Sequence, residues 1–80
     1  MTEKERLAFE NAYMANVSSC SRERLSAFMD IYMDLNKRDG GNFTEDEYYK
    51  FSDIYGSVMD AIGMWDSARR FQINLIGETA

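Results

Sequence analysis

The chain contains no proline, and its large apolar residues recur at steps of three and four along most of its length. This spacing places apolar side chains on one side of an α-helix, whereas a half-buried strand would show alternation. Proline, the strongest helix breaker, never interrupts the pattern. We therefore expect an all-α fold, a small helical bundle. Its 80 residues form one domain over residues 1–80, because a chain this short cannot build a second core.

Capping signals predict the first two helices. Thr2 and Glu5 match a capping box, in which the hydroxyl and the carboxylate satisfy two free amides, and the helix should reach about Asn16. Serines within residues 18–21 offer caps for a second helix, which should end near Lys37 ahead of a glycine turn. The expected buried residues of these helices are Leu7, Phe9, Tyr13, Val17, Leu25, Phe28, Met29, Tyr32 and Leu35.

A third helix is expected from Glu45, because Thr44 and Glu47 form another capping box. Its apolar stripe continues to Ile76. Two versions are open: one bent helix over residues 45–76, which we favour, or a break near Gly63 that creates a fourth helix. Gly77 is the expected C-terminal stop.

The composition argues against catalysis and cofactor chemistry. The chain has no histidine and one cysteine, Cys20, so the usual metal ligand sets and disulfides are missing, and we expect no catalytic residue, no metal, no cofactor and no small-molecule substrate. Fourteen acidic residues against nine basic ones give a net charge of −5, which disfavours direct nucleic-acid binding. The sequence shows neither an export signal nor an apolar run long enough to span a membrane, so we expect a cytoplasmic protein.

The residues around Gly40 and Gly41 resemble the calcium loop of an EF-hand. With Glu47 as the terminal carboxylate, Gly41 falls at the turn glycine. The leading ligand positions then fall on Asn36, Arg38 and Gly40, and a guanidinium cannot bind a dication. A capping box and a glycine stop explain the same residues without calcium.

An acidic face is a second candidate feature. Asp46, Asp53 and Asp60 recur every seven residues, so on one continuous helix they would lie on one side. Such a row could mimic a phosphate backbone and inhibit a DNA-binding or DNA-processing protein. The alternative is an ordinary solvated face.

Apolar residues near the end of the chain exceed what one intramolecular seam can cover. We expect Trp65, Phe71, Leu75 and Ile76 to contact a partner, together with Tyr49, which should lie at the edge of the core while its neighbour Tyr48 faces inward. The simplest partner is a second copy of the chain, giving a homodimer, with an unidentified protein as a further partner. The alternative is that the helix folds back and covers its own end.

Two short segments, residues 9–13 (FENAY) and residues 64–70 (MWDSARR), resemble small acidic proteins from the early regions of lambda-like bacteriophages. The resemblance covers about a quarter of the chain. It implies a helical, cytoplasmic, often dimeric protein that modulates a host process by binding host factors, and it implies no catalytic residue.

Overall fold

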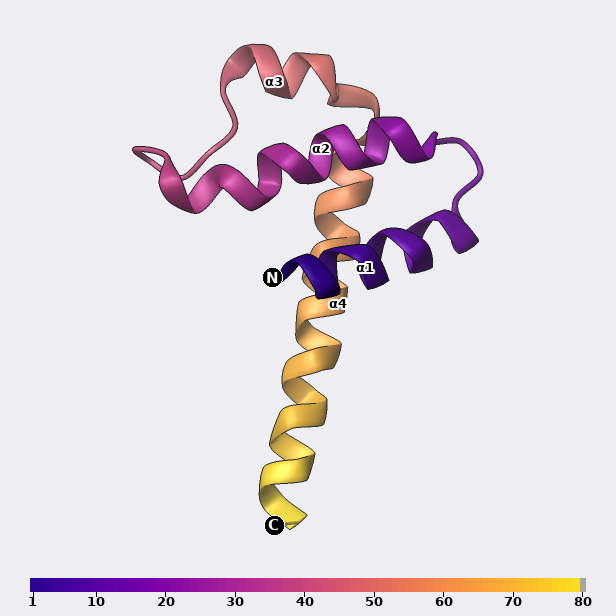
Figure 1. Ribbon diagram of the computed structural model, residues 1–80, viewed down its shortest axis with the longest axis vertical. Helices are drawn as coiled ribbons and strands as arrows, with labels where there is room; N and C mark the ends of the chain where they lie inside the picture. Colours follow the sequence, from indigo (N-terminus) through magenta and orange to yellow (C-terminus); the bar gives the residue numbers. More distant parts are fainter. Residues whose placement is uncertain (80) are drawn as a thin grey trace.

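A computed structural model describes the chain through Thr79 and its side chains through Ala68. It contains four α-helices: α1 (Glu3–Asn16), α2 (Arg22–Asp34), α3 (Glu45–Lys50) and α4 (Ser52–Thr79), with a 3₁₀ turn at Leu35–Lys37. None of the residues through Thr79 lies in a strand, so the all-α prediction is confirmed. The helices α1 and α2 run antiparallel, and α4 crosses both of them (Figure 1).

The first two helices begin where the caps predict. The Thr2 hydroxyl accepts a hydrogen bond from the Glu5 amide at 3.2 Å, and the Ser21 hydroxyl accepts one from the Arg24 amide at 3.1 Å. Each bond satisfies one of the amides that a helix N-terminus leaves without a partner.

The turn after α2 also follows the prediction. Gly40 and Gly41 have φ angles of +84° and +63°, a region that residues with a side chain rarely adopt. Thr44 and Glu47 then form a complete capping box: the Glu47 amide donates to the Thr44 hydroxyl at 3.2 Å, and the Thr44 amide donates to the Glu47 carboxylate at 2.9 Å.

The predicted single helix over residues 45–76 is wrong at Phe51, where α3 ends and α4 begins. Gly63, the alternative position for a break, lies inside α4, and Gly77 does not stop the helix, which continues to Thr79. Phe51 leaves helical geometry (φ −112°, ψ 19°) and is buried, with its ring edge-on to Phe28 at 5.7 Å between centroids. The break therefore turns an aromatic ring into the core.

Arg24 of α2 stabilises this break. Its guanidinium donates to the Lys50 carbonyl at the end of α3 and to the Asp53 carboxylate at the start of α4, and it lies 5.4 Å from the centre of the Phe51 ring. One side chain thus satisfies the C-terminus of one helix and pairs with the first turn of the next.

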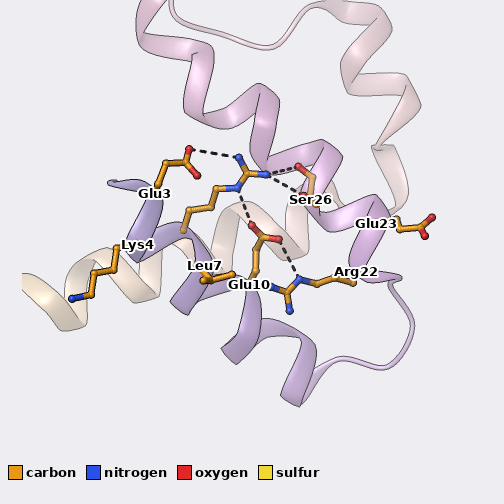
Figure 2. A pocket seen from close by; sticks show the side chains of 8 residues that line it. Glu3, Lys4, Leu7, Glu10, Arg22, Glu23 and Ser26 are labelled. Carbon is orange, nitrogen blue, oxygen red and sulfur yellow. Dashed lines mark hydrogen bonds and ion pairs between the residues drawn. The ribbon is translucent and has the colours of Figure 1, made fainter.

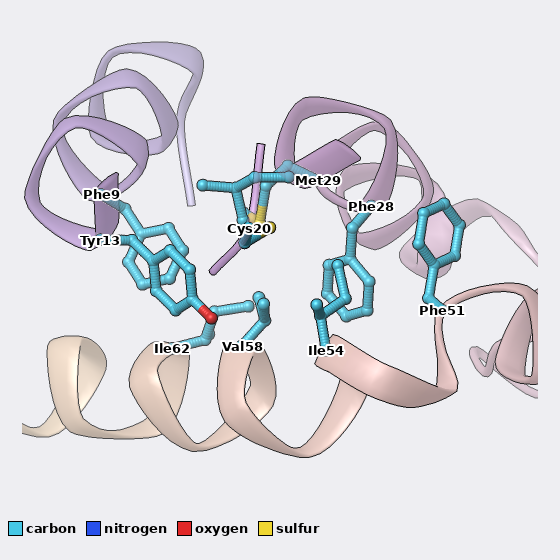
Figure 3. Packing of buried hydrophobic residues seen from close by; sticks show 10 residues of the cluster. Phe9, Tyr13, Cys20, Phe28, Met29, Phe51, Ile54, Val58 and Ile62 are labelled. Atoms are coloured by element: carbon cyan, nitrogen blue, oxygen red, sulfur yellow. The ribbon is translucent and has the colours of Figure 1, made fainter. Parts of the chain in front are cut away.

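The core lies where α4 crosses α1 and α2 (Figure 3). On α4, Ile54, Val58 and Ile62 face the other helices one turn apart. The buried apolar residues are Phe9, Tyr13, Cys20, Leu25, Phe28, Met29, Phe51, Ile54, Val58 and Ile62.

Two of the expected core residues are exposed. Leu7 lies on another side of α1 from Phe9 and Tyr13 and is 56% exposed. Tyr48 is 45% exposed, because the break at Phe51 changes which residues of α3 and α4 share a face. Its ring still packs edge-on against Tyr55 at 4.9 Å between centroids.

Phe28 holds the largest share of this core, so its truncation should be costly. It is fully buried and contacts the rings of Phe43, Phe51 and Tyr55. We predict that Phe28→Ala lowers the free energy of unfolding by about 3–5 kcal/mol, measured by urea denaturation. Leu7→Ala is the control and should change it by less than about 0.5 kcal/mol. Equal losses in the two variants would contradict this core.

Candidate interaction surface

An apolar groove runs between α1 and α4. It has a volume of about 530 Å³ and is open to solvent. Its lining is mostly apolar or aromatic: Phe9, Ala12, Tyr13, Val17, Ala61, Met64 and Trp65, with Asn16, Ser57 and Asp60 as its polar members. Met64 is 74% exposed, so most of this lining side chain is open to contact. The groove is the described surface best suited to an apolar partner.

A hydrogen bond joins the two helices that line the groove. The Tyr13 and Ser57 hydroxyls share a hydrogen bond of 3.0 Å, which joins α1 to α4. Asp60 is exposed, one turn along α4 from Ser57. A partner that enters the groove would therefore meet apolar side chains first and a negative charge beside them.

Trp65 was expected to contact a partner, and it lies at the end of this groove. It is half-buried, and its ring stacks edge-on against Phe9 at 5.9 Å between centroids. Part of this side chain thus supports the chain's own core, and the rest lines the groove.

The other three predicted contact residues near the chain end, Phe71, Leu75 and Ile76, have side chains outside the described part. Their backbone belongs to α4, whose outer half extends away from α1 and α2 (Figure 1). The prediction that these residues contact a partner therefore rests on their place in a projecting helix. Tyr49, the fifth predicted contact, is 64% exposed on α3, away from the groove lining, and its ring packs against Tyr48.

The three heptad-spaced carboxylates do not share one helix. Asp46 lies on α3, whereas Asp53 and Asp60 lie on α4, because the break at Phe51 separates them. All three are exposed. The Arg24 guanidinium pairs with Asp53 and holds the pKa of that carboxyl below its usual range. A continuous row of free negative charge is therefore absent from this part of the molecule, which weakens the case for a phosphate mimic.

An ion-pair cluster between α1 and α2 was missed from the sequence (Figure 2). Glu10 is 5% exposed and pairs with the Arg6 Nε at 2.8 Å and the Arg22 Nε at 3.3 Å. Arg6 also donates to the Ser26 carbonyl at 3.0 Å and pairs with Asp30 at 2.7 Å. Arg6, Glu10 and Arg22, which line the cavity beside this cluster, are thus already paired with one another, and we assign the cluster a structural role.

The loop that resembles an EF-hand is held by an arginine. Arg38 pairs with both carboxylate oxygens of Glu47, the residue at the terminal ligand position, and with Asp34 at 3.7 Å. Phe43 anchors the loop by packing on Phe28 at 5.0 Å between ring centroids. A guanidinium thus takes the place that a cation would occupy. In the described part of the chain, no three acidic or cysteine side chains gather closely enough to bind a metal.

Cys20 is buried, and burial raises the pKa of its thiol. A raised thiol pKa reduces the thiolate fraction at neutral pH, so the residue is poorly suited to nucleophilic chemistry. It packs as a small member of the core.

No family model, curated protein or solved structure matches the chain. Of the described helices, none has both the length and the apolar character that a membrane crossing requires.

The Glu10 cluster predicts a large effect from one substitution. Glu10→Ala leaves Arg6, whose side chain is 12% exposed, without the only buried carboxylate among its described partners. Breaking a buried ion pair is strongly destabilising, so the free energy of unfolding should fall by about 3 kcal/mol in urea denaturation. Glu23→Ala, at an exposed position of α2, is the control and should be nearly neutral. A neutral Glu10→Ala variant would show that the cluster does not hold α1 to α2.

The Arg38–Glu47 pair predicts an acid-sensitive contribution to stability. Hydrogen bonding to Arg38 lowers the pKa of Glu47 from 4.5 to about 2. A carboxyl whose pKa is depressed by folding stabilises the fold above its unfolded pKa, and this contribution is lost as pH falls. Thermal unfolding between pH 5 and pH 2 should therefore show a steeper loss of stability in the wild type than in Glu47→Gln. Glu45→Gln, two residues earlier on α3, should keep the wild-type slope, and identical slopes in all three proteins would refute the pair.

Proposed function

We propose that the chain is a protein–protein interaction module that acts as a homodimer and binds a further protein, without catalytic chemistry of its own. The observation that carries this proposal is the form of α4, which lines an apolar groove with its middle and then extends beyond the other helices (Figure 1). An extended helix end with Phe71, Leu75 and Ile76 gains stability only when another surface covers it, by about 1.5–3 kcal/mol for each large side chain.

The resemblance to early-region proteins of lambda-like bacteriophages favours a host factor in the cytoplasm as the further partner. Tyr49 is the aromatic group best placed to serve it, since it is exposed on α3 and does not line the groove. Exposed tyrosines are common anchors at protein interfaces, because one end of the ring is apolar and the other forms hydrogen bonds.

Inhibition of a DNA-binding protein by the carboxylates Asp46, Asp53 and Asp60 is the alternative function. It should be sensitive to salt and should weaken when all three become asparagine. Two observations count against this alternative: Asp46 lies on a different helix from Asp53 and Asp60, and Asp53 is paired with Arg24.

The homodimer predicts a specific effect of charge at the end of α4. Purified wild-type protein should sediment as a dimer. Leu75→Asp should raise the dimer dissociation constant at least about a hundredfold, because the interface would lose a large apolar group and gain a buried charge. Analytical ultracentrifugation over a range of concentrations measures this change.

Gly63→Asp is the matched control, because it adds the same charge to the same helix. Gly63 is exposed, and an added Cβ there meets open space. This variant should keep the wild-type dissociation constant. A wild-type protein that stays monomeric at every concentration would contradict the homodimer.

A further inference from the structure

Five residues of α4 recur at alternating steps of three and four: Ala61, Met64, Ala68, Phe71 and Leu75. This is the spacing of the contact positions in a two-helix coiled coil. Met64 and Ala68 are exposed, and Ala61 is half-buried in the groove. Because α4 is one continuous helix, Phe71 and Leu75 fall in the same register as these three residues.

This series, the α4 seam, is separate from the face of α4 that builds the core. The core face carries Ile54, Val58 and Ile62, about 100° around the helix from the centre of the seam. Two seam residues, Ala61 and Met64, also line the groove beside α1. The groove and the projecting end of α4 therefore belong to one apolar surface.

The chain's own helix end cannot fill its groove. The groove lies beside the middle of α4, and a continuous helix cannot fold its outer half back against its middle. The earlier alternative, in which the helix covers its own end, needs a break that α4 does not contain between Ser52 and Thr79. The occupant must come from another molecule.

A second copy offers residues that complement those of the groove. When two α4 helices run antiparallel and cross near Asp66, Ala61 lies opposite the other copy's Phe71, and Met64 lies opposite its Ala68. Ser57, which lines the groove, lies opposite Leu75. Each layer pairs a large residue with a small one, which is how facing helices fill space without gaps. A parallel pair would instead place identical residues together.

Charge favours the same direction. The groove half of α4 carries the exposed Asp60, and the outer half carries Arg69 and Arg70 in its sequence. Along the axis of an antiparallel pair, Asp60 of each copy comes level with Arg70 of the other, within about 3 Å by the helical rise, whereas a parallel pair brings identical charges level with one another.

We propose that the homodimer forms by antiparallel pairing of two α4 helices, so that the outer half of each helix fills the α1–α4 groove of the other copy. This arrangement rests on the proposed homodimer and specifies its interface. A two-fold axis near Asp66 then repeats every contact twice, as a closed symmetric dimer requires. The tyrosines of α3 do not line the seam and stay available for a further partner.

Cross-linking between two single-cysteine variants tests the pairing. Asp60 and Asn74 each precede a seam residue and lie on the same edge of the seam. In the antiparallel pair, position 60 of one copy lies beside position 74 of the other, while the two copies of position 60 are about 18 Å apart along the axis. Asp60→Cys and Asn74→Cys are made separately in a Cys20→Ala background, mixed, allowed to exchange and treated with a short bismaleimide.

The expected result is a covalent dimer from the mixture, linked between positions 60 and 74 by peptide mass spectrometry, and none from either variant alone. Glu23→Cys, exposed on α2, should not link to either variant. Circular dichroism and sedimentation establish that each variant is helical and dimeric before treatment.

The outcomes distinguish a wrong antiparallel interface from a wrong homodimer. Dimers without the 60–74 link, or with links between two like positions, would overturn the antiparallel pairing and leave the homodimer standing. A wild-type protein that sediments only as a monomer would overturn both.

Discussion

The packing of α4 against α1 and α2 is the contact on which the rest of the molecule depends. Ile54, Val58 and Ile62 form one apolar line that meets residues of both other helices, with Val58 fully buried at its centre. The loop between α1 and α2 makes them antiparallel neighbours, and the Glu10 ion pairs hold them together. Phe9 and Tyr13 of α1 and Leu25, Phe28 and Met29 of α2 belong to the same buried cluster as this line, so loss of contact with α4 would expose apolar residues of both helices.

The crossing of α4 with α1 also determines where the groove and the projecting helix end lie. Because α1 crosses α4 near its middle, the groove opens beside Ala61 and Met64, and the outer part of α4 extends beyond every other helix (Figure 1). The break at Phe51 contributes, since it lets α4 begin on the core and run in a direction that α3 does not share. The helix α4 therefore supplies both one side of the groove and an outer end with apolar residues in its sequence, and the two sets of residues share one helical register.

Much of the fold follows from local signals in the sequence. Thr2, Ser21 and Thr44 cap the helices that they predict, and Gly40 and Gly41 adopt the positive φ angles that a turn requires. These features depend on residues within one helical turn, so a single sequence contains the information. Tyr49 is exposed and Trp65 lines the groove, while their contact with a partner stays a prediction.

The features that the sequence did not predict depend on contacts between distant residues. The break at Phe51 has no proline or glycine to mark it and is stabilised by Arg24, which lies on another helix. The Glu10 cluster joins side chains from α1 and α2, and the groove exists only through the angle between α1 and α4.

The most direct test of the dimer is isotope-filtered NMR on a mixture of labelled and unlabelled chains. The proposed antiparallel interface requires a nuclear Overhauser effect between the Phe71 ring of one copy and the Ala61 methyl of the other. Phe71 contacts confined to its own chain would contradict it.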